Sequence, residues 1–232
     1  MRTNDTPSPA SGPSRKAAAP LEREEAWWAA HPGGRLAGVD EAGRGPLAGP
    51  VAAGAVSIPP PLARTLRAGP LAGLTDSKRL SESEREALFE TLTHAEGVSW
   101  ALGLAGPEEI DRLNILRATH LAMRRALEAL PGGAPDFALV DGLPVCGLPC
   151  GHEAVVKGDA RCFLVAAASI VAKVSRDRLM TALDASFPGY GFAVHKGYPT
   201  PSHLEALSRL GPCPAHRRTF GPVRDVLNPP ML

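Results

Sequence analysis

Four acidic residues draw attention because each lies where a predicted strand or helix begins or ends. Asp40 and Glu41 close a short apolar strand, and Asp141 closes another. Asp159 comes just before a long apolar helix. Carboxylate oxygens are the ligands that Mg²⁺ and Mn²⁺ prefer, and acids gathered without His or Cys are typical of metal-assisted phosphoryl transfer. Because such a cluster repels itself, we expect cations to occupy it.

The first two acids lie in the sharpest local motif of the chain. Adjacent strand residues point to opposite faces, so Asp40 and Glu41 share one site only if the strand ends or bulges at Glu41. Gly43 and Gly45 would let the backbone approach a ligand closely, and Arg44 between them supplies positive charge. Taken singly, each of these four acids also has a structural explanation, as a solvated loop residue, a turn residue or a helix N-cap.

Basic and aromatic residues supply candidate contacts to a phosphate backbone. Lys78 and Arg79 come just before a predicted helix N-terminus, where phosphate is favoured. Lys173 and Arg176 are three residues apart on the long helix, so they share a face. Tyr198 lies in a Gly/Pro-rich loop with a neighbouring lysine, a combination suited to stacking on nucleic acid. Each of these is also compatible with an ordinary solvated surface.

Other motifs do not support a zinc site or a nucleotide cofactor. Cys146, Cys150 and His152 superficially resemble zinc ligands, but their spacing is not that of a standard zinc site. The glycine-rich stretches match neither the P-loop nor the dinucleotide-binding fingerprint. Four cysteines in 232 residues do not make a disulfide framework, which favours a reducing compartment and a cytoplasmic location.

Composition and charge narrow the class further. With 44% hydrophobic and 21% charged residues, the chain is neither disordered throughout nor collagen-like. The longest uncharged stretch, residues 46–63, holds five prolines, so we expect no membrane helix. Residues 157–232 carry 10 Lys and Arg against 5 Asp and Glu, whereas residues 1–156 carry 15 against 19. The basic C-terminal third is compatible with a polyanion partner or with uneven surface charge.

The elements that must position these residues follow an α/β pattern with a mixed sheet. A Ser81–Glu84 capping box opens one helix, and Pro107 opens another whose apolar spacing runs to Leu130. Residues 1–34 are expected to form a disordered or weakly ordered tail, with a possible short helix at 22–30, and residues 35–232 to form one domain. The predicted strands are 36–40, 51–58, 98–104 and 137–141, and the further helices are 162–186 and 203–209.

The chain resembles ribonuclease HII from about residue 36 to residue 226. The segments that carry the resemblance are GVDEAGRGPL from residue 38, DSK from 76, LNIL from 113, DG from 141, KGD from 157, AAASIVAKV from 166, HKGYPT from 195 and RRTFGPV from 217. So many segments in the same order make the resemblance highly specific. It leaves the N-terminal tail uncovered, and the loop 143–152 departs from it with additional Cys and Pro.

The resemblance implies a ribonuclease H-like α/β fold, with a mixed five-stranded sheet, flanking helices and a helical C-terminal extension. Asp40, Glu41, Asp141 and Asp159 match the catalytic acids that hold two Mg²⁺ or Mn²⁺ ions. The resemblance also assigns substrate contacts. The loop that recognises the ribonucleotide 2′-hydroxyl is matched by Gly43, Arg44 and Gly45, the phosphate contact by Lys78, and the stacking tyrosine by Tyr198.

The implied activity is cleavage of the RNA strand of RNA–DNA hybrids and cutting 5′ of single ribonucleotides embedded in duplex DNA. We expect a monomer that acts on these nucleic acids and not on membranes. Ribonuclease HIII shares much of the pattern but carries a folded N-terminal domain, for which residues 1–35 are too short and polar. A noncatalytic hybrid-binding module would lack one of the acids, and a transposase or resolvase of the same fold would lack the Gly-Arg-Gly segment.

Overall fold

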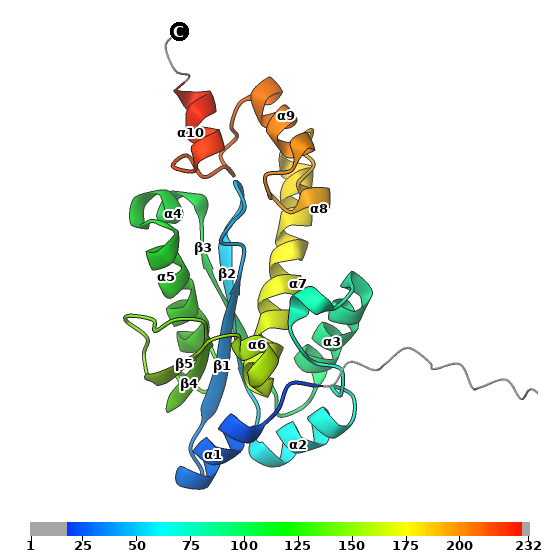
Figure 1. Cartoon of the computed structure of the whole chain (residues 1–232), viewed down its shortest axis with the longest axis vertical. Coiled ribbons are helices and arrows are strands. Elements are labelled where there is room, and N and C mark those ends of the chain that lie inside the picture. The colour runs from blue at the N-terminus through cyan, green and yellow to red at the C-terminus, as the bar shows by residue number, and fades with distance from the viewer. Residues whose placement is uncertain (1–17, 229–232) are drawn as a thin grey trace, which may run out of the picture.

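A five-stranded mixed sheet with β1 at its centre organises the computed structural model, which describes residues 18–228 (Figure 1). The strand order is β3-β2-β1-β4-β5. Strands β1, β2 and β3 are antiparallel neighbours, whereas β4 and β5 continue the sheet in parallel with β1. The predicted mixed sheet is confirmed. The strands are β1 Leu36–Ala42, β2 Val51–Ser57, β3 Ser99–Ala105, β4 Phe137–Asp141 and β5 Gly151–Val155.

Small residues in the central strands allow helices to approach the sheet closely. A Cβ at Gly38 or Gly54 would lie 2.1–2.4 Å from the backbone of α7 (Phe163–Ser186). On the other face, a Cβ at Gly103 would lie 2.0 Å from the backbone of α5 (Ile115–Glu128). Because real Cβ atoms do not approach other atoms so closely, glycine at these positions sets the spacing between the layers.

The helices form two layers, one on each face of the sheet (Figure 1). The buried cluster around α7 includes side chains from the N-terminal elements and α3, and the cluster around α5 covers the opposite face. The remaining helices are α1 Glu22–Ala30, α2 Pro60–Ala68, α3 Glu82–His94, α4 Pro107–Leu113, α6 Gly158–Arg161, α8 Phe192–His195, α9 Pro201–Leu210 and α10 Gly221–Leu227, with a 3₁₀ turn η1 at Ser77–Arg79.

The helix expected from Pro107 to Leu130 is in fact two helices. Asn114 adopts a left-handed conformation with φ of 68°, which ends α4 and begins α5. Its Oδ1 accepts a hydrogen bond from the N–H of Arg117 at 3.1 Å and so caps α5. The continuous apolar spacing concealed this break, because both helices bury their apolar residues against the same side of the sheet.

The N-terminal residues that the structure describes pack firmly on the domain. The short helix predicted at 22–30 is present as α1, with Trp28 buried in the core around α7. A carboxylate oxygen of Glu24 accepts a hydrogen bond from the N–H of Leu164 at 2.9 Å. The prediction of a weakly ordered tail over residues 1–34 is therefore wrong for residues 18–34, and residues 1–17 lie outside the described part.

A helical C-terminal extension follows α7, as predicted. Helices α8, α9 and α10 lie at the end of the molecule beyond the sheet, beside the connection between β1 and β2 (Figure 1). An antiparallel bridge between Ala48 and His216 ties this extension to that connection. Within residues 18–228, no helix is both long enough and apolar enough to cross a membrane.

Candidate active site

The first acids lie where the central strands separate. The β1–β4 ladder ends at the pair Val39 and Val140, so Asp40 and Asp141 are the next residues on two adjacent parallel strands. The expectation that β1 ends or bulges at Glu41 is wrong, because β1 stays paired with β2 through Ala42. Loss of the β4 partner at this point nevertheless leaves room for the acidic side chains at one edge of the ladder.

Asp40 and Asp159 are both buried, each with 6% of its surface exposed. Burial raises the pKa of Asp40 well above its ordinary value, and the charges of Glu41 and Asp141 raise it further. Within the described residues, the Asp40 carboxylate accepts one hydrogen bond, from the Glu41 N–H at 2.7 Å. Its charge is therefore only weakly compensated by the protein.

Glu41 belongs to the same electrostatic cluster. Burial raises its pKa, whereas Arg44, whose Nη1 donates to the Glu41 Oε1 at 3.2 Å, acts to lower it. Asp141 raises the pKa of Glu41 in turn, and Lys78 acts to lower it. Both members of the Asp40–Glu41 pair are thus within electrostatic reach of Asp141, as the sequence argument required.

A tight turn brings Asp159 to the other acids. Lys157 adopts a left-handed conformation with φ of 57°, and the N–H of Gly158 then donates to the Asp141 Oδ1 at 2.6 Å. Burial raises the pKa of Asp159 to about 6, with further contributions from Asp76 and Asp141. The alternative of a helix N-cap does not apply to Asp159, since it lies inside α6 and makes no capping bond.

Lys78 reaches the acids from η1. Burial acts to lower the pKa of Lys78, but the charges of four aspartates together raise it: Asp159, Asp40, Asp76 and Asp141. Asp76, which the sequence argument passed over as a candidate, lies beside Asp159 and accepts a hydrogen bond from the Lys78 N–H at 2.9 Å. Its sequence signals were its position directly before the Ser77–Arg79 turn and its place in the DSK segment that carries the family resemblance.

Arg217 holds the glycine-rich loop from behind. Its guanidinium is fully buried and donates to three carbonyl oxygens, at 2.6 Å to Gly43, 2.9 Å to Arg44 and 3.0 Å to Gly49. Burial and the nearby Arg176 lower the pKa of Arg217 to about 9. The conformation of the loop is therefore fixed by a side chain about 170 residues further along the chain.

Arg176 also holds backbone segments in place. The prediction that it is a surface contact for phosphate is therefore wrong. Arg176 is 1% exposed and donates to the carbonyl oxygens of Pro50, Ala48 and Lys196 at 3.0–3.2 Å. A Cβ at Gly43, where φ is +91°, would lie 1.9 Å from the Arg176 Nε. Gly43 is thus required both by its conformation and by the close packing of this guanidinium.

Tyr198 lies beside the same loop. A Cβ added to Gly45 would be 3.8 Å from the Tyr198 ring, and 43% of the tyrosine is exposed. The N–H of Leu47 donates to the carbonyl of Gly197 at 2.8 Å, which joins the two loops directly. The structure therefore places the Gly43–Gly45 loop and Tyr198 side by side, with Arg44 in contact with Glu41 of the acidic cluster.

Comparison with known proteins now decides the family. A sequence model described as Ribonuclease HII matches residues 37–223. The chain belongs to the ribonuclease HII family. It is therefore a ribonuclease H, an endoribonuclease that acts on RNA–DNA hybrids.

Individual relatives agree with this assignment. The chain is 53% identical over 195 residues to the ribonuclease HII of Nitrosococcus oceani, covering 84% of this chain and 92% of that protein. It is 52% identical over 193 residues to the ribonuclease HII of Syntrophotalea carbinolica, covering 83% and 88%.

Solved structures show the same fold. The ribonuclease H2 of Pyrococcus horikoshii superposes with a TM-score of 0.68 at 30% identity, covering 83% of this chain and 96% of that one. A ribonuclease HIII, Bst-RNase HIII in complex with Mn²⁺, superposes with a TM-score of 0.68 at 19% identity, covering 89% and 80%. The latter likeness is one of fold alone.

The acids of this ribonuclease HII have the donor chemistry of a site for hard cations. They are buried carboxylates that repel one another, and oxygen ligands of this kind suit Mg²⁺ or Mn²⁺. Across residues 18–228, however, no three His, Cys, Asp or Glu side chains converge on one point as in a finished metal site. Cys146 and His152 of the zinc-like motif instead contact neighbouring parts of their own loop and α5 through hydrogen bonds.

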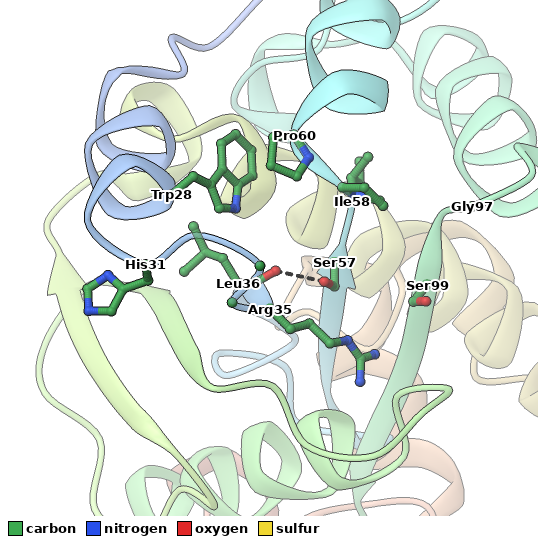
Figure 2. Close-up of a pocket in the computed structure, with 12 residues that line it drawn as sticks. Trp28, His31, Arg35, Leu36, Ser57, Ile58, Pro60, Gly97 and Ser99 are labelled. Atoms are coloured by element: carbon green, nitrogen blue, oxygen red, sulfur yellow. Dashed lines mark hydrogen bonds between the residues drawn. The ribbon is translucent and has the colours of Figure 1, made fainter.

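A cavity of about 360 Å³ lies beside the start of β1, apart from the acids. It is lined by Trp28 of α1, Leu36 of β1 and Pro60 of α2 (Figure 2). A hydrogen bond of 2.7 Å from the Ser57 hydroxyl to the Leu36 carbonyl closes its floor. No carboxylate lines it, in contrast to the acidic cluster at the other end of β1.

Proposed function

We propose that this ribonuclease cuts on the 5′ side of a ribonucleotide, both in RNA–DNA hybrids and at single ribonucleotides embedded in duplex DNA. The products would be a 3′-hydroxyl and a 5′-phosphate, and the activity would serve ribonucleotide excision and RNA primer removal. The observation that carries the proposal is the rigid Gly43–Gly45 loop, held by Arg217 and faced by Tyr198 beside the buried acids.

The loop offers a means of recognising one 2′-hydroxyl. This group alone distinguishes RNA from DNA at a single position. Gly43 and Gly45 present backbone without side chains, so a sugar would approach their polar groups closely. Tyr198 has an exposed ring beside Gly45 on which the next sugar would rest. Recognition at one sugar would explain cutting at an isolated ribonucleotide.

The acids supply the chemistry at the scissile phosphate. We assign Asp40, Glu41, Asp141 and Asp159 to two Mg²⁺ or Mn²⁺ ions, which would activate water and stabilise the leaving oxygen. The Mn²⁺ complex of the ribonuclease HIII of similar fold supports the choice of metal.

The chain's own residues orient these groups and the substrate. Gly158 holds the Asp141 carboxylate in place through its N–H. Lys78, whose charge interacts with the acids, would bind a phosphate oxygen of the substrate at the edge of the cluster. All of these residues belong to one chain, so the proposal requires only a monomer.

The test is cleavage of a labelled DNA duplex that contains one ribonucleotide, with Mg²⁺, Mn²⁺ or EDTA. We expect a metal-dependent cut on the 5′ side of the ribonucleotide and none in an all-DNA duplex. Asp141→Asn should abolish cutting while binding to an RNA–DNA hybrid persists, and Asp225→Asn, an exposed acid on α10, should behave as wild type.

Two results would contradict the proposal. If the duplex remained intact while a long hybrid was cut, recognition of the single 2′-hydroxyl would fail although the metal site stood. If neither substrate was cut but the hybrid was bound, the chain would be a noncatalytic binding module. Retained turnover of Asp141→Asn in Mg²⁺ would remove this residue from the metal set.

A further inference from the structure

Three buried histidines lie beneath the Tyr198 loop, outside the acidic site. His203 is fully buried, His216 is 2% exposed and His195 is 8% exposed. They surround Phe192, whose ring contacts all three imidazoles at centroid distances of 5.5–6.1 Å. The cluster joins α8, the start of α9 and the segment after α9, so it lies at the centre of the C-terminal extension.

The hydrogen bonds of His216 and His203 fix one arrangement of protons. The Cys213 N–H donates to the His216 Nδ1 at 3.1 Å, so the proton of neutral His216 is on Nε2. This Nε2 lies 3.1 Å from the His203 Nε2, which must therefore accept. The proton of His203 is then on Nδ1, where it is donated to the Tyr198 carbonyl oxygen at 2.9 Å.

His195 is fixed in the same manner. The Gly197 N–H donates to the His195 Nδ1 at 3.1 Å, so its Nε2–H donates to the Tyr190 carbonyl at 2.7 Å. Its ring stacks on His203 at a centroid distance of 4.3 Å. Each ring nitrogen of the three histidines thus has a partner, which leaves no lone pair for a metal ion.

Burial favours the neutral form of the cluster. It lowers the pKa of His216 to about 4, with a further lowering by His203, and it also lowers the pKa of His203. A charged His216 would carry protons on both nitrogens and could no longer accept from Cys213. The chain of hydrogen bonds is therefore intact at neutral pH.

The Tyr198 backbone is clamped between this chain and the glycine-rich loop. On one side the His203 ring binds the Tyr198 carbonyl, and on the other the Leu47 N–H binds the carbonyl of Gly197. Gly197 has φ of +82°, and a Cβ there would lie 2.6 Å from the Ala48 carbonyl oxygen. The Tyr198 carbonyl also accepts from the Thr200 N–H at 2.8 Å, and the Tyr198 N–H donates to the His195 carbonyl at 2.9 Å. Among the hydrogen bonds of the described residues to the Tyr198 backbone, the bond from His203 is the one that a side chain makes.

We propose that His203 is a positioning residue for substrate recognition, which holds the Tyr198 ring against the Gly43–Gly45 loop through a relay that begins at Cys213 and passes through His216. The inference rests on the proposed role of Tyr198 at the substrate sugar. It adds a specific task for His203 and His216, whose ring nitrogens are all engaged in hydrogen bonds within the protein.

A matched pair of substitutions separates this role from simple core packing. In His203→Asn the amide nitrogen replaces Nδ1, so donation to the Tyr198 carbonyl is kept. In His203→Gln the amide reaches the position of Nε2, so the contact with His216 is kept and the bond to Tyr198 is lost. Both variants remove the ring, so we expect similar decreases in Tm.

The expected result is a difference in recognition between the two variants. With a duplex containing one ribonucleotide, His203→Gln should raise KM about tenfold, the scale of a weakened stacking contact, whereas His203→Asn should raise it less than about threefold. In a Tyr198→Ala background, His203→Gln should cause no further increase in KM. Equal KM values for the two variants, or effects that multiply with Tyr198→Ala, would overturn the inference.

Failure of the underlying proposal gives a different pattern. If Tyr198→Ala itself cuts the duplex like wild type, the substrate role of Tyr198 falls, and the positioning role falls with it. If Tyr198→Ala is impaired but the Asn and Gln variants match, only the positioning role of His203 is wrong.

A measurement on the wild-type protein tests the relay without any substitution. Long-range ¹H–¹⁵N NMR spectra of the imidazoles should report protons on Nδ1 of His203 and on Nε2 of His195 and His216. Should His203 carry its proton on Nε2, it could not donate to the Tyr198 carbonyl, and the inference would be refuted.

Discussion

Two buried groups of charged residues face each other across the Gly43–Gly45 loop, and they are built on opposite principles. The acids at the ends of β1 and β4 repel one another. Within the described residues, the Asp40 carboxylate accepts one hydrogen bond, from the Glu41 N–H. The guanidiniums of Arg176 and Arg217 each donate to three backbone carbonyls, and within residues 18–228 neither forms an ion pair.

The difference separates reactive sites from supporting ones. A buried charge is expensive unless hydrogen bonds or opposite charges compensate it. Asp40 has the least compensation, with one hydrogen bond to its carboxylate and no ion pair within residues 18–228, so its charge is available to a cation. The guanidiniums are satisfied by backbone and so hold a loop in shape. Substitutions in the two groups should therefore change stability in opposite directions.

Among the substitutions considered, Asp40→Asn is expected to have the largest effect. Asparagine keeps the acceptor for the Glu41 N–H but removes one of the repelling charges. We expect kcat to fall by about 10³-fold or more, equivalent to about 4 kcal/mol of transition-state stabilisation. In EDTA the variant should be more stable by about 1 kcal/mol, a rise in Tm of roughly 2–4 °C.

Asp225→Asn is the matched control, since this exposed acid pairs with Arg224 at 3.2 Å. It should leave both kcat and Tm near wild type. A loss of stability in Asp40→Asn would show that the carboxylate is compensated after all, and the contrast between the two groups would collapse.

Arg217→Lys should have the reverse effect on stability. A lysine reaches at most one of the three carbonyls, so two buried acceptors lose their donors. We expect the free energy of unfolding to fall by about 3 kcal/mol, or roughly 6–12 °C in Tm. Exposed Arg218→Lys serves as the control in the same thermal melts. An unchanged Tm for Arg217→Lys would mean that the carbonyls find other donors.

Glu24 extends the comparison to the N-terminal helix. Burial raises its pKa from 4.5 to about 7, although the Leu164 N–H acts against this. Between these pH values the folded protein holds a proton that the unfolded chain releases, so stability falls as pH rises. We expect a loss of up to about 2–3 kcal/mol between pH 4.5 and 7 from denaturant unfolding.

Glu24→Gln should flatten this part of the pH profile, whereas Asp225→Asn, at an exposed acid of α10, should leave it unchanged. Stability that rises with pH equally in both variants and wild type would show that Glu24 is ionised in the folded state.

Arg44→Ala should produce the smallest of these effects. Arg44 is largely exposed and contacts Glu41 at 3.2 Å, so its loss costs little stability. We expect cutting at a single ribonucleotide to fall about tenfold, or about 1.4 kcal/mol, with metal affinity retained by calorimetry. Equal cutting by variant and wild type at limiting substrate would remove Arg44 from substrate recognition.

Local sequence signals predicted the acids and most of the sheet. Asp40, Glu41 and Asp141 were recognisable because acids are poorly suited to strands and these directly follow apolar strand residues, and the capping box at Ser81 marked the start of α3 correctly. The cap at Asn114 and the continued pairing of β1 through Ala42 are local features that the sequence did not reveal. The functional roles of the acids remain predictions until the substitutions are made.

Contacts between residues far apart in the chain could not be predicted from local sequence signals. Arg176 was expected on the surface because its neighbours on α7 are charged, yet its partners are carbonyls about 126–128 residues earlier in the chain. The edge strand β5 was missed because its alternation of exposed and half-buried residues includes Gly, His and Glu. Residues of these kinds give a weak strand signal, and only the pairing with β4 makes the strand.

The bond between Glu24 and the N–H of Leu164 spans 140 residues, and this has a consequence for synthesis of the protein on the ribosome. At about 5–20 residues per second, α1 would wait roughly 7–28 s before its docking surface on α7 is translated. During that time the apolar side chains of Leu21 and Trp28 have no native partner on that helix. The nascent N-terminus would thus be the segment most in need of chaperone protection.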